Sequence, residues 1–191
     1  MVSENKIQLR KVGIFSPQYE QPVTELVQEW FVPHGIEISP LEENAGRNED
    51  LDLVLSFGGD GTVLAALSLF PQCPVLAVNF GNVGFLTAGD REELTDMLQS
   101  VLEGKYIISE RSVLECVHPQ GKDFAVNEVV VRGATRLIAV ELNINEQHIR
   151  RVRGDGVIVG TATGSTAYLL AAGSPIVMPE LRCMIITGLN E

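Results

Sequence analysis

The segment Phe57–Thr62 reads Phe-Gly-Gly-Asp-Gly-Thr and carries the sharpest chemical signal in the chain. Its three glycines allow the backbone to approach a ligand closely, and a helix that starts there would offer free N–H groups to a phosphate. Asp60 is the unusual member, because a carboxylate repels phosphate unless it accepts a proton from an attacking hydroxyl or helps to hold Mg²⁺. We therefore predict a phosphate-binding loop made by Gly58, Gly59, Gly61 and Thr62. The alternative is a plain strand–helix turn in which Asp60 is the N-cap.

A second glycine turn, Asn79–Thr87 (NFGNVGFLT), also follows a predicted strand. Its Asn79 and Phe85 could line a pocket for a base or a ribose. The alternative is a turn that binds no ligand. The sequence contains neither of the familiar phosphate loops, G-x-x-x-x-G-K-[ST] and G-x-G-x-x-G after the first strand.

Two adjacent polar residues, Asn127 and Glu128, interrupt the apolar run FAVNEVVV. In a strand they would point to opposite faces, so at least one is poorly placed for burial. An amide and a carboxylate together suit the hydroxyl groups of a ribose. The alternative is a strand that begins at Val129, with Asn127 in a turn.

The last constellation begins with Arg153–Gly156 (RGDG) and continues, after a short strand, with Thr161–Tyr168 (TATGSTAY). Hydroxyl groups and a glycine open a predicted helix there, which again favours an anion. Arg150, Arg151 and Arg153 form a basic cluster in an acidic chain, although Arg150 and Arg151 can equally belong to a solvated face. Arg153 differs because it adjoins the Gly-Asp-Gly turn.

The elements around the first motif predict an α/β domain with a parallel sheet. Asp52–Phe57 is an apolar run that ends at the glycines, as expected of a strand buried on both faces. Strands and helices alternate around it, which is the order of a parallel sheet with crossover helices. We expect strands at Lys11–Ser16, Gly35–Ile38, Asp52–Phe57 and Pro74–Asn79, helices at Val23–Phe31, Thr62–Phe70 and Glu92–Leu102, and a polar surface loop at Glu42–Asp50.

The pattern changes near residue 105, where strand-like runs follow one another across short polar turns and indicate antiparallel β structure. These runs are Arg111–His118, Asp123–Arg132, Leu137–Asn145, Gln147–Arg153 and Val157–Val159, with Thr166–Ala172 as the only later helix candidate. We therefore expect a boundary near residues 103–108. It would separate an α/β nucleotide-binding domain, residues 1–104, from an incomplete β-rich domain, residues 105–191.

The composition is that of a globular protein: the 191 residues are 45% hydrophobic and 20% charged, with a formal net charge of −11. This charge argues against nucleic acid or an anionic membrane as a partner and leaves open a small phosphorylated ligand. Cys73, Cys116 and Cys183 form no C-x-x-C pair, so we expect reduced core residues, and the three histidines lie too far apart for a zinc site. The chain has no secretory signal and no apolar run near the ~20 residues of a membrane span, so we expect a cytoplasmic protein.

The ordered set of Gly58–Thr62, Gly81–Thr87, Asn127-Glu128 and Gly154–Tyr168 resembles the NAD kinases, over about Lys11 to Glu180. The resemblance implies a transferase that moves a phosphoryl group from ATP to the 2′-hydroxyl of the adenosine ribose of NAD, giving NADP, with Mg²⁺ as the divalent cation. It also implies the α/β domain followed by a β-rich domain described above. We further expect a homo-oligomer.

By the same resemblance, Asp60 is the general base that activates the ribose hydroxyl, and Asp60 and Gly61 contact the NAD. Asn127 and Glu128 would bind its adenosine ribose, and Asp155 the other end of the dinucleotide. The remaining substrate contacts would come from Arg136, Arg153, Thr166, Ala167, Tyr168 and the position of Ala171. No protein residue is assigned to a metal.

The chain departs from the family pattern at several positions. Ala162 stands where the family usually has Pro, Ser174 where it has Gly, and Ala171 where a Ser commonly contacts substrate. Family members also continue beyond Pro179–Leu181 with further strands, whereas this chain ends soon after the apolar run Cys183–Thr187. We therefore expect a half-built β layer with open edges, in a fragment, a chain completed by a partner subunit, or a protein without activity.

The alternatives to an NAD kinase are two. The first is a catalytically silent dinucleotide-binding or regulatory module, and the second is another Gly-Gly-Asp-Gly-Thr kinase that acts on a lipid or a sugar.

Overall fold

The computed structural model describes residues 2–3, 7–17, 20–41, 50–81 and 84–191. Contacts divide the chain into two compact units, an N-terminal unit, Val2–Ile108, and a C-terminal unit, Ser109–Glu191. Of the predicted surface loop Glu42–Asp50, only Asp50 is among the described residues, and it is exposed.

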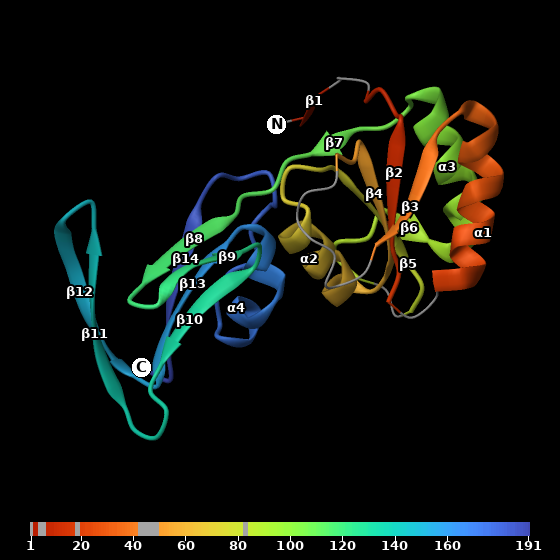
Figure 1. Ribbon diagram of the computed structural model, residues 1–191. Helices are drawn as coiled ribbons and strands as arrows, with labels where there is room; N and C mark the ends of the chain where they lie inside the picture. Colours follow the sequence, from red (N-terminus) through yellow and green to blue (C-terminus); the bar gives the residue numbers. More distant parts are fainter. Residues whose placement is uncertain (1, 4–6, 18–19, 42–49, 82–83) are drawn as a thin grey trace. The chain divides into compact units, whose positions relative to one another are not determined.

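The N-terminal unit is built on a five-stranded parallel sheet in the order β3-β2-β4-β5-β6 (Figure 1). Its strands are β2 (Lys11–Phe15), β3 (Glu37–Leu41), β4 (Leu53–Gly58), β5 (Val75–Asn79) and β6 (Gly89–Asp90). Every residue of β4 is buried, because strands flank it and helices cover both faces of the sheet. The predicted parallel sheet with crossover helices is confirmed.

Helices α1 (Glu20–Phe31) and α3 (Leu94–Glu103) lie on one face of this sheet, and α2 (Asp60–Leu69) lies on the other (Figure 1). Leu55 of β4 belongs to the core on the α1 and α3 face, whereas its neighbour Val54 belongs to the core on the α2 face. Side chains alternate along a strand, so β4 supplies both cores. The shorter elements of this part of the chain are η1 (Val32–His34), η2 (Arg91–Glu93), and the paired strands β1 (Val2–Ser3) and β7 (Ile108–Ser109).

The C-terminal unit pairs its strands in antiparallel fashion, as predicted. A three-stranded sheet runs in the order β10 (Glu128–Arg132), β13 (Gly156–Thr161) and β14 (Met184–Leu189). Two hairpins accompany it, β8 (Leu114–His118) with β9 (Gly121–Ala125), and β11 (Ile138–Ile144) with β12 (Gln147–Gly154). Ile158, Leu169 and Leu189 form the buried core of this unit.

Two predicted elements are each divided in the structure. The segment Asp123–Arg132, predicted as one strand, forms the end of β9 and all of β10, with a bend between them at residues 126–127. The predicted helix Thr166–Ala172 is instead a 3₁₀ turn, η3 (Thr163–Thr166), followed by the short helix α4 (Tyr168–Ala171). Ala167 separates the two, with φ −96° and ψ −132°, outside the helical region.

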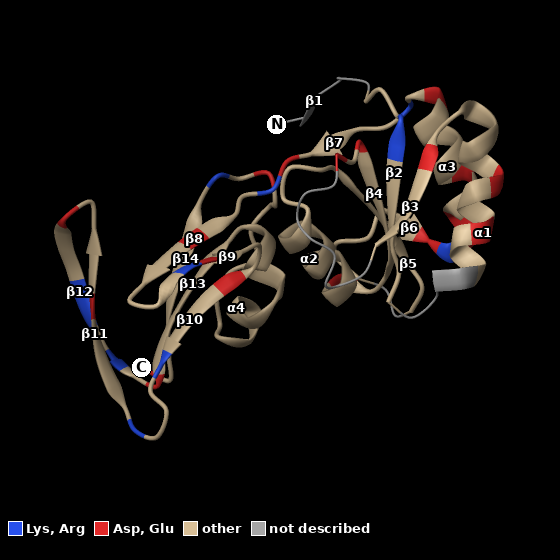
Figure 2. Cartoon of the chain, viewed as in Figure 1, with Lys and Arg blue, Asp and Glu red and all other residues tan. Residues whose placement is uncertain are grey.

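Acidic residues outnumber basic ones by 25 to 14, and Figure 2 shows many of them on α1 and α3. The three cysteines are free, and Cys73 and Cys116 are partly buried. Cys183 is exposed in the segment before β14, so the prediction of a core position is wrong for this residue. Within the described ranges, no helix is long and apolar enough to cross a membrane.

Candidate functional site

Asp60 is the first residue of α2, directly beyond the carboxyl end of β4. Its carboxylate accepts one hydrogen bond from the backbone N–H of Phe85 and one from that of Leu86, each 3.0 Å long. The N-cap of α2 is Gly59, and no side chain caps the helix. The alternative that makes Asp60 the cap is therefore wrong, because this carboxylate binds the loop before β6 instead of its own helix.

The glycines near this carboxylate have two different explanations. A Cβ on Gly58 would overlap the side chain of Thr62, and a Cβ on Gly84 would overlap the Asp60 carboxylate. A Cβ on Gly59 or Gly61, in contrast, would meet no atom within 4 Å. Internal packing thus accounts for two of the glycines, while the other two border open space. Open space at a helix N-terminus, where backbone N–H groups point out of the helix, suits a phosphate.

Asn79 is buried and uses both ends of its amide inside the N-terminal unit. Its Nδ2 donates to Asp90 at 2.9 Å, and its Oδ1 accepts the N–H of Gly81 at 3.1 Å. The Asn79 amide therefore stabilises the turn after β5 through hydrogen bonds within the protein, which agrees with the alternative of a turn that binds no ligand. Phe85 of the same motif is 75% exposed, and residues 82–83 lie outside the described part of the chain.

At the start of β10, the structure brings the predicted ribose contacts together with the segment after β13. The N–H of Tyr168 donates to the Glu128 carboxylate, and Gly164 packs against the backbone of Asn127, where a Cβ would overlap the carbonyl oxygen. Asn127 lies in the bend and the strand begins at Glu128, one residue earlier than the alternative proposed. We call this group the η3 cluster, made of Asn127, Glu128, Thr166, Ala167, Tyr168 and Ala171.

Two buried oxygen atoms, one in the η3 cluster and one beside it, have no hydrogen-bond partner among the described residues. They are Oε2 of Glu128, in the cluster, and Oγ1 of Thr163, in the adjoining η3 turn. Burial raises the pKa of Glu128 above its usual value, and the hydrogen bond from Tyr168 offsets this only in part. Because native structures leave few buried polar atoms unpaired, these oxygens mark places where a ligand can supply the missing hydrogen bond.

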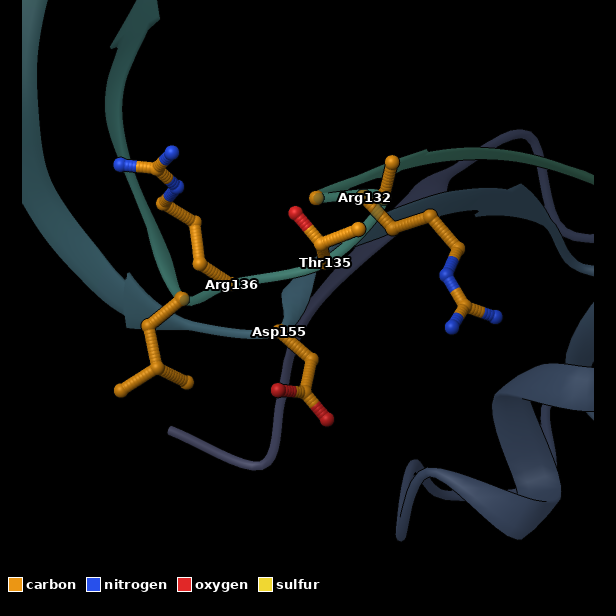
Figure 3. Close-up of a pocket in the computed structure, with 7 residues that line it drawn as sticks. Arg132, Thr135, Arg136 and Asp155 are labelled. Atoms are coloured by element: carbon orange, nitrogen blue, oxygen red, sulfur yellow. The ribbon is translucent and has the colours of Figure 1, made fainter.

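A cavity of about 390 Å³ lies beyond the opposite end of β10 (Figure 3). Three hydrogen bonds hold Asp155 in its wall. Nδ2 of Asn190 donates to its carboxylate at 2.7 Å, the N–H of Gly133 donates to its carbonyl at 3.0 Å, and its own N–H donates to the carbonyl of Leu189 at 2.8 Å. The lining consists of Arg132, Gly133, Ala134, Thr135, Arg136, Leu137 and Asp155.

The cationic side chains of this region do not converge. In Figure 3 the guanidinium groups of Arg132 and Arg136 point away from each other. Arg153 is exposed on β12, paired with Ala139 of β11, and does not line the cavity. The structure therefore places Arg136 in one cavity with Asp155 and leaves Arg153 outside it.

The η3 cluster and the cavity lie at the two ends of one strand pair. Glu128 pairs with Gly160 at one end of β10, and Arg132 pairs with Gly156 at the other. Four steps along a strand, at about 3.3 Å each, separate these ends by roughly 13 Å. The predicted substrate contacts of the C-terminal unit thus form two groups on one sheet.

Three features of these sites received no individual role from the sequence. Thr161 is fully buried at the end of β13, and the sequence marked it only as the first hydroxyl of the segment Thr161–Tyr168. Arg132 lines the cavity and is marked only as a basic residue at the end of an apolar strand. The N–H groups of Phe85 and Leu86, which bind Asp60, carry no side-chain signal at all.

The departures from the family pattern are accommodated locally. Ala162 has φ −58°, the value that proline imposes, so the η3 turn keeps its geometry without the proline ring. Ser174 is buried, and its hydroxyl lies 2.7 Å from that of Thr187, which satisfies it where the family has glycine. Ala171 is exposed at the end of α4, so a methyl group replaces a hydroxyl at the surface of the η3 cluster.

Comparison with known proteins gives matches along most of the chain. The family model described as ATP-NAD kinase N-terminal domain matches residues 21–106, and the one described as ATP-NAD kinase C-terminal domain matches residues 126–190. The NAD kinase of Methanothermobacter thermautotrophicus is 39% identical over an alignment of length 144, which covers 73% of this chain and 51% of that protein. The NAD kinase of Desulfatibacillum aliphaticivorans is 35% identical over an alignment of length 201, which covers 94% of this chain and 71% of that protein. The chain thus spans about half the length of the first relative and about 71% of the length of the second.

Two solved structures share the fold, and together with the sequence matches they define the family. A yeast NADH kinase in complex with NADH aligns with a TM-score of 0.78 and 25% identity, over 95% of this chain and 66% of that one. An NAD kinase from Archaeoglobus fulgidus in complex with ATP aligns with a TM-score of 0.80 and 28% identity, over 94% of this chain and 72% of that one. The predicted fold class, a parallel α/β sheet followed by antiparallel β structure, is therefore confirmed, and the chain belongs to the ATP-NAD kinase family.

Proposed function

We propose that the chain binds NAD and ATP and transfers the γ-phosphoryl group of ATP to the 2′-hydroxyl of the adenosine ribose, giving NADP and ADP. The observation that carries this proposal is the Asp60 carboxylate, which two backbone N–H groups hold beside glycines that border open space. A fixed negative charge would repel the phosphate in a loop that only bound phosphate. A general base for a hydroxyl nucleophile accounts for it.

In this reaction Asp60 accepts the proton of the 2′-hydroxyl. The ribose oxygen then forms a bond to the γ-phosphorus, while the bond from that phosphorus to the bridging oxygen of ADP breaks. Because phosphoryl transfer depends mainly on positioning and on neutralising charge, the phosphates need a fixed cradle. We assign this cradle to the backbone of Gly58, Gly59, Gly61 and Thr62 at the start of α2.

The proposed nucleotide contacts of the C-terminal unit lie in the η3 cluster and in the cavity at the other end of β10. We assign the adenosine ribose to Asn127 and Glu128, supported by the unpaired buried oxygen of Glu128. We assign the other end of the dinucleotide to Asp155, with Arg136 from the same cavity. Further substrate contacts are assigned to Arg153, Thr166, Ala167, Tyr168 and Ala171. The two proposed domains are residues 1–104 and residues 105–191.

We assign Mg²⁺ as the divalent cation. Mg²⁺ in kinases is held by one or two carboxylates together with substrate phosphates, and Asp60 brings one carboxylate to the glycine loop. No group of three or more His, Cys, Asp or Glu in the described ranges could form an all-protein site. When bound, the cation would neutralise charge on the transferred phosphoryl group.

We also propose that the protein is a cytoplasmic homo-oligomer that binds neither nucleic acid nor membranes. A formal net charge of −11 disfavours nucleic acid and anionic membranes as partners, and free cysteines are typical of a reducing cytoplasm. A homo-oligomer is supported by exposed apolar side chains near β14, where Ile176, Met178, Leu181 and Met184 are 67%, 67%, 54% and 66% exposed.

The test is to incubate the purified chain with NAD, ATP and Mg²⁺ and to measure NADP by chromatography. We expect NADP with the complete mixture and none when ATP or Mg²⁺ is omitted. Asp60→Asn should stop turnover, and Asp96→Asn, which changes an exposed acid of α3 in the same way, should not.

Two outcomes would overturn the proposal. Binding of NAD, measured by titration, without any turnover of the unchanged chain would make it a silent dinucleotide-binding module. Phosphorylation of a lipid or a sugar, but not of NAD, would support the second alternative, a lipid or sugar kinase, which the family matches do not favour.

A further inference from the structure

Thr161, the last residue of β13, makes hydrogen bonds to three different backbone groups. Its side chain is 0% exposed. The hydroxyl donates to the carbonyl of Val126 at 2.5 Å and accepts the N–H of Gly164 at 3.1 Å. Its own N–H donates to the carbonyl of Asn127 at 2.9 Å. One buried residue therefore joins the bend before β10 to the η3 turn.

These bonds fix the backbone on both sides of the η3 cluster. The carbonyls of Val126 and Asn127 are both taken by Thr161, and the start of β10 at Glu128 is paired with Gly160. On the other side, Gly164 lies so close to the backbone of Asn127 that there is no room for a Cβ. The position of the Asn127 backbone is thus set by contacts with β13 and η3 that lie far away in sequence.

We propose that Thr161 is a positioning residue for NAD: its hydroxyl holds the Asn127 bend against η3, so that Asn127 and Glu128 meet the ribose in the required geometry. The inference rests on the proposed function, because it assumes that these two residues bind the ribose. Since Thr161 is fully buried, its effect on a ligand must pass through its neighbours.

The residue type matters because the hydroxyl acts as donor and acceptor at once. Serine keeps both roles, whereas valine has nearly the same shape and neither role. In Thr161→Val, the carbonyl of Val126 and the N–H of Gly164 lose their partner inside a packed region, which favours a shifted bend.

The test compares Thr161→Val with Thr161→Ser and with the matched variant Thr187→Val. Thr187 also sits in this sheet, on β14, and its hydroxyl bonds to Ser174 instead of the bend. We expect Thr161→Val to raise the KM for NAD by about five- to tenfold, with kcat and the KM for ATP little changed. Thr161→Ser should restore the KM, and Thr187→Val should lower only the melting temperature.

A double-mutant cycle with Asn127→Ala separates positioning from general stability. If Thr161 acts through Asn127, the Thr161→Val effect on NAD affinity, measured by titration, should largely disappear in the Asn127→Ala background. Equal effects in both backgrounds, or equal KM values for Thr161→Val and the unchanged chain, would overturn the inference.

Two further measurements keep the result interpretable. Should Thr161→Val fail to fold, Thr161→Cys replaces the hydroxyl with a weaker donor, and an unchanged NAD affinity in that variant would also count against the inference. NAD titration requires no turnover, so it reports on Thr161 even if the unchanged chain forms no NADP, the outcome that would instead refute the proposed reaction.

Discussion

Gly84 lies so close to Asp60 that a single added carbon atom at residue 84 would overlap the carboxylate. The backbone N–H groups of the next two residues, Phe85 and Leu86, donate to the same carboxylate. The loop before β6 therefore sets the position of Asp60 by contact and by hydrogen bonds together.

Gly84→Ala should lower kcat, because the new methyl group pushes the Asp60 carboxylate away from its present position. Displacement of a reacting group by about 1 Å can cost on the order of 10²-fold in rate, so we expect a fall of about 10- to 100-fold. The melting temperature should change little, since the displaced atoms are the end of a side chain. Gly81→Ala is the matched control, because a Cβ there meets no atom within 4 Å. Equal kcat values for the two variants would show that the contact does not position the carboxylate.

Asp60→Asn should lower kcat by about 10²–10⁴, the usual effect of losing a general base. The change keeps the size of the side chain, and because Gly59 is the cap of α2, the helix loses no capping group. Asparagine has one carbonyl oxygen, however, so it can replace only one of the two oxygens that accept the N–H groups of Phe85 and Leu86. Steady-state kinetics measure the fall in kcat, and a melting curve measures any loss of stability separately. A variant that keeps the unchanged kcat would exclude Asp60 as the base.

Asn127→Ala should behave differently from Asp60→Asn. A ribose contact acts in the ground state and in the transition state alike, so its loss should raise the KM for NAD and leave kcat nearly constant. The expected loss of binding free energy is about 1–3 kcal/mol, that of a buried hydrogen bond left unmade. A large fall in kcat at constant KM would contradict the assignment.

Glu128→Gln should stabilise the protein at pH 7 while weakening NAD binding. Burial raises the pKa of Glu128 in the folded chain above its usual value of 4.5, so the folded state binds this proton more tightly than the unfolded state. The stabilisation from the protonated form is complete below pH 4.5 and is lost as the pH rises through the folded-state pKa. Above that pH the charged carboxylate is a cost, and glutamine removes it.

Melting curves at pH 7.5 and pH 4 test the sign of this effect. The variant should melt at most about 2–4 °C above the unchanged chain at pH 7.5, and the difference should vanish at pH 4. Glu180→Gln, which alters an exposed glutamate of the same unit, is the control. A gain of the same size at both pH values would mean that ionisation of Glu128 is not its source.

Cys73 should resist alkylation that modifies Cys183. Burial, with a smaller contribution from the charge of Asp52, raises the pKa of Cys73 to about 11, so at pH 8 only about one molecule in a thousand carries the reactive thiolate. Mass spectrometry after iodoacetamide treatment at pH 8 should find the label on the exposed Cys183 and on Cys73 only after urea is added. Early labelling of Cys73 in the folded chain would contradict this.

The parts of the fold that follow from local pattern were predictable from the sequence. Asp52–Phe57 is apolar without alternation, and only a strand buried on both faces suits such a run. The glycines after it indicate the sharp turn into α2. The same reasoning placed Asp60 at the loop but gave no sign of the N–H groups that its carboxylate accepts, because they lie 25 and 26 residues away in sequence.

The breaks within the C-terminal unit involve long-range contacts, and the sequence indicated only the first of them, through the alternative that placed Asn127 in a turn. FAVNEVVV has no Gly or Pro, and its apolar residues favour one continuous strand. At the bend of residues 126–127, the carbonyl of Val126 accepts a hydrogen bond from the hydroxyl of Thr161, which lies 35 residues further along the chain. In the same way, the interruption at Ala167 follows a turn pressed against the Asn127 backbone, which no pattern within Thr166–Ala172 encodes.

The pairing of β10 with β13 has a consequence for which ligands can reach both ends of the sheet at once. The interval between the η3 cluster and the cavity depends on how many residue pairs join the two strands, running from Glu128–Gly160 to Arg132–Gly156, and no side-chain substitution alters it. Inserting two residues in each strand would lengthen the interval by about 7 Å and keep every side chain on its face. Under the proposed assignment of NAD to both groups, the strand length would select molecules by their span, and a mononucleotide that carries the same ribose would engage one end and leave the other empty.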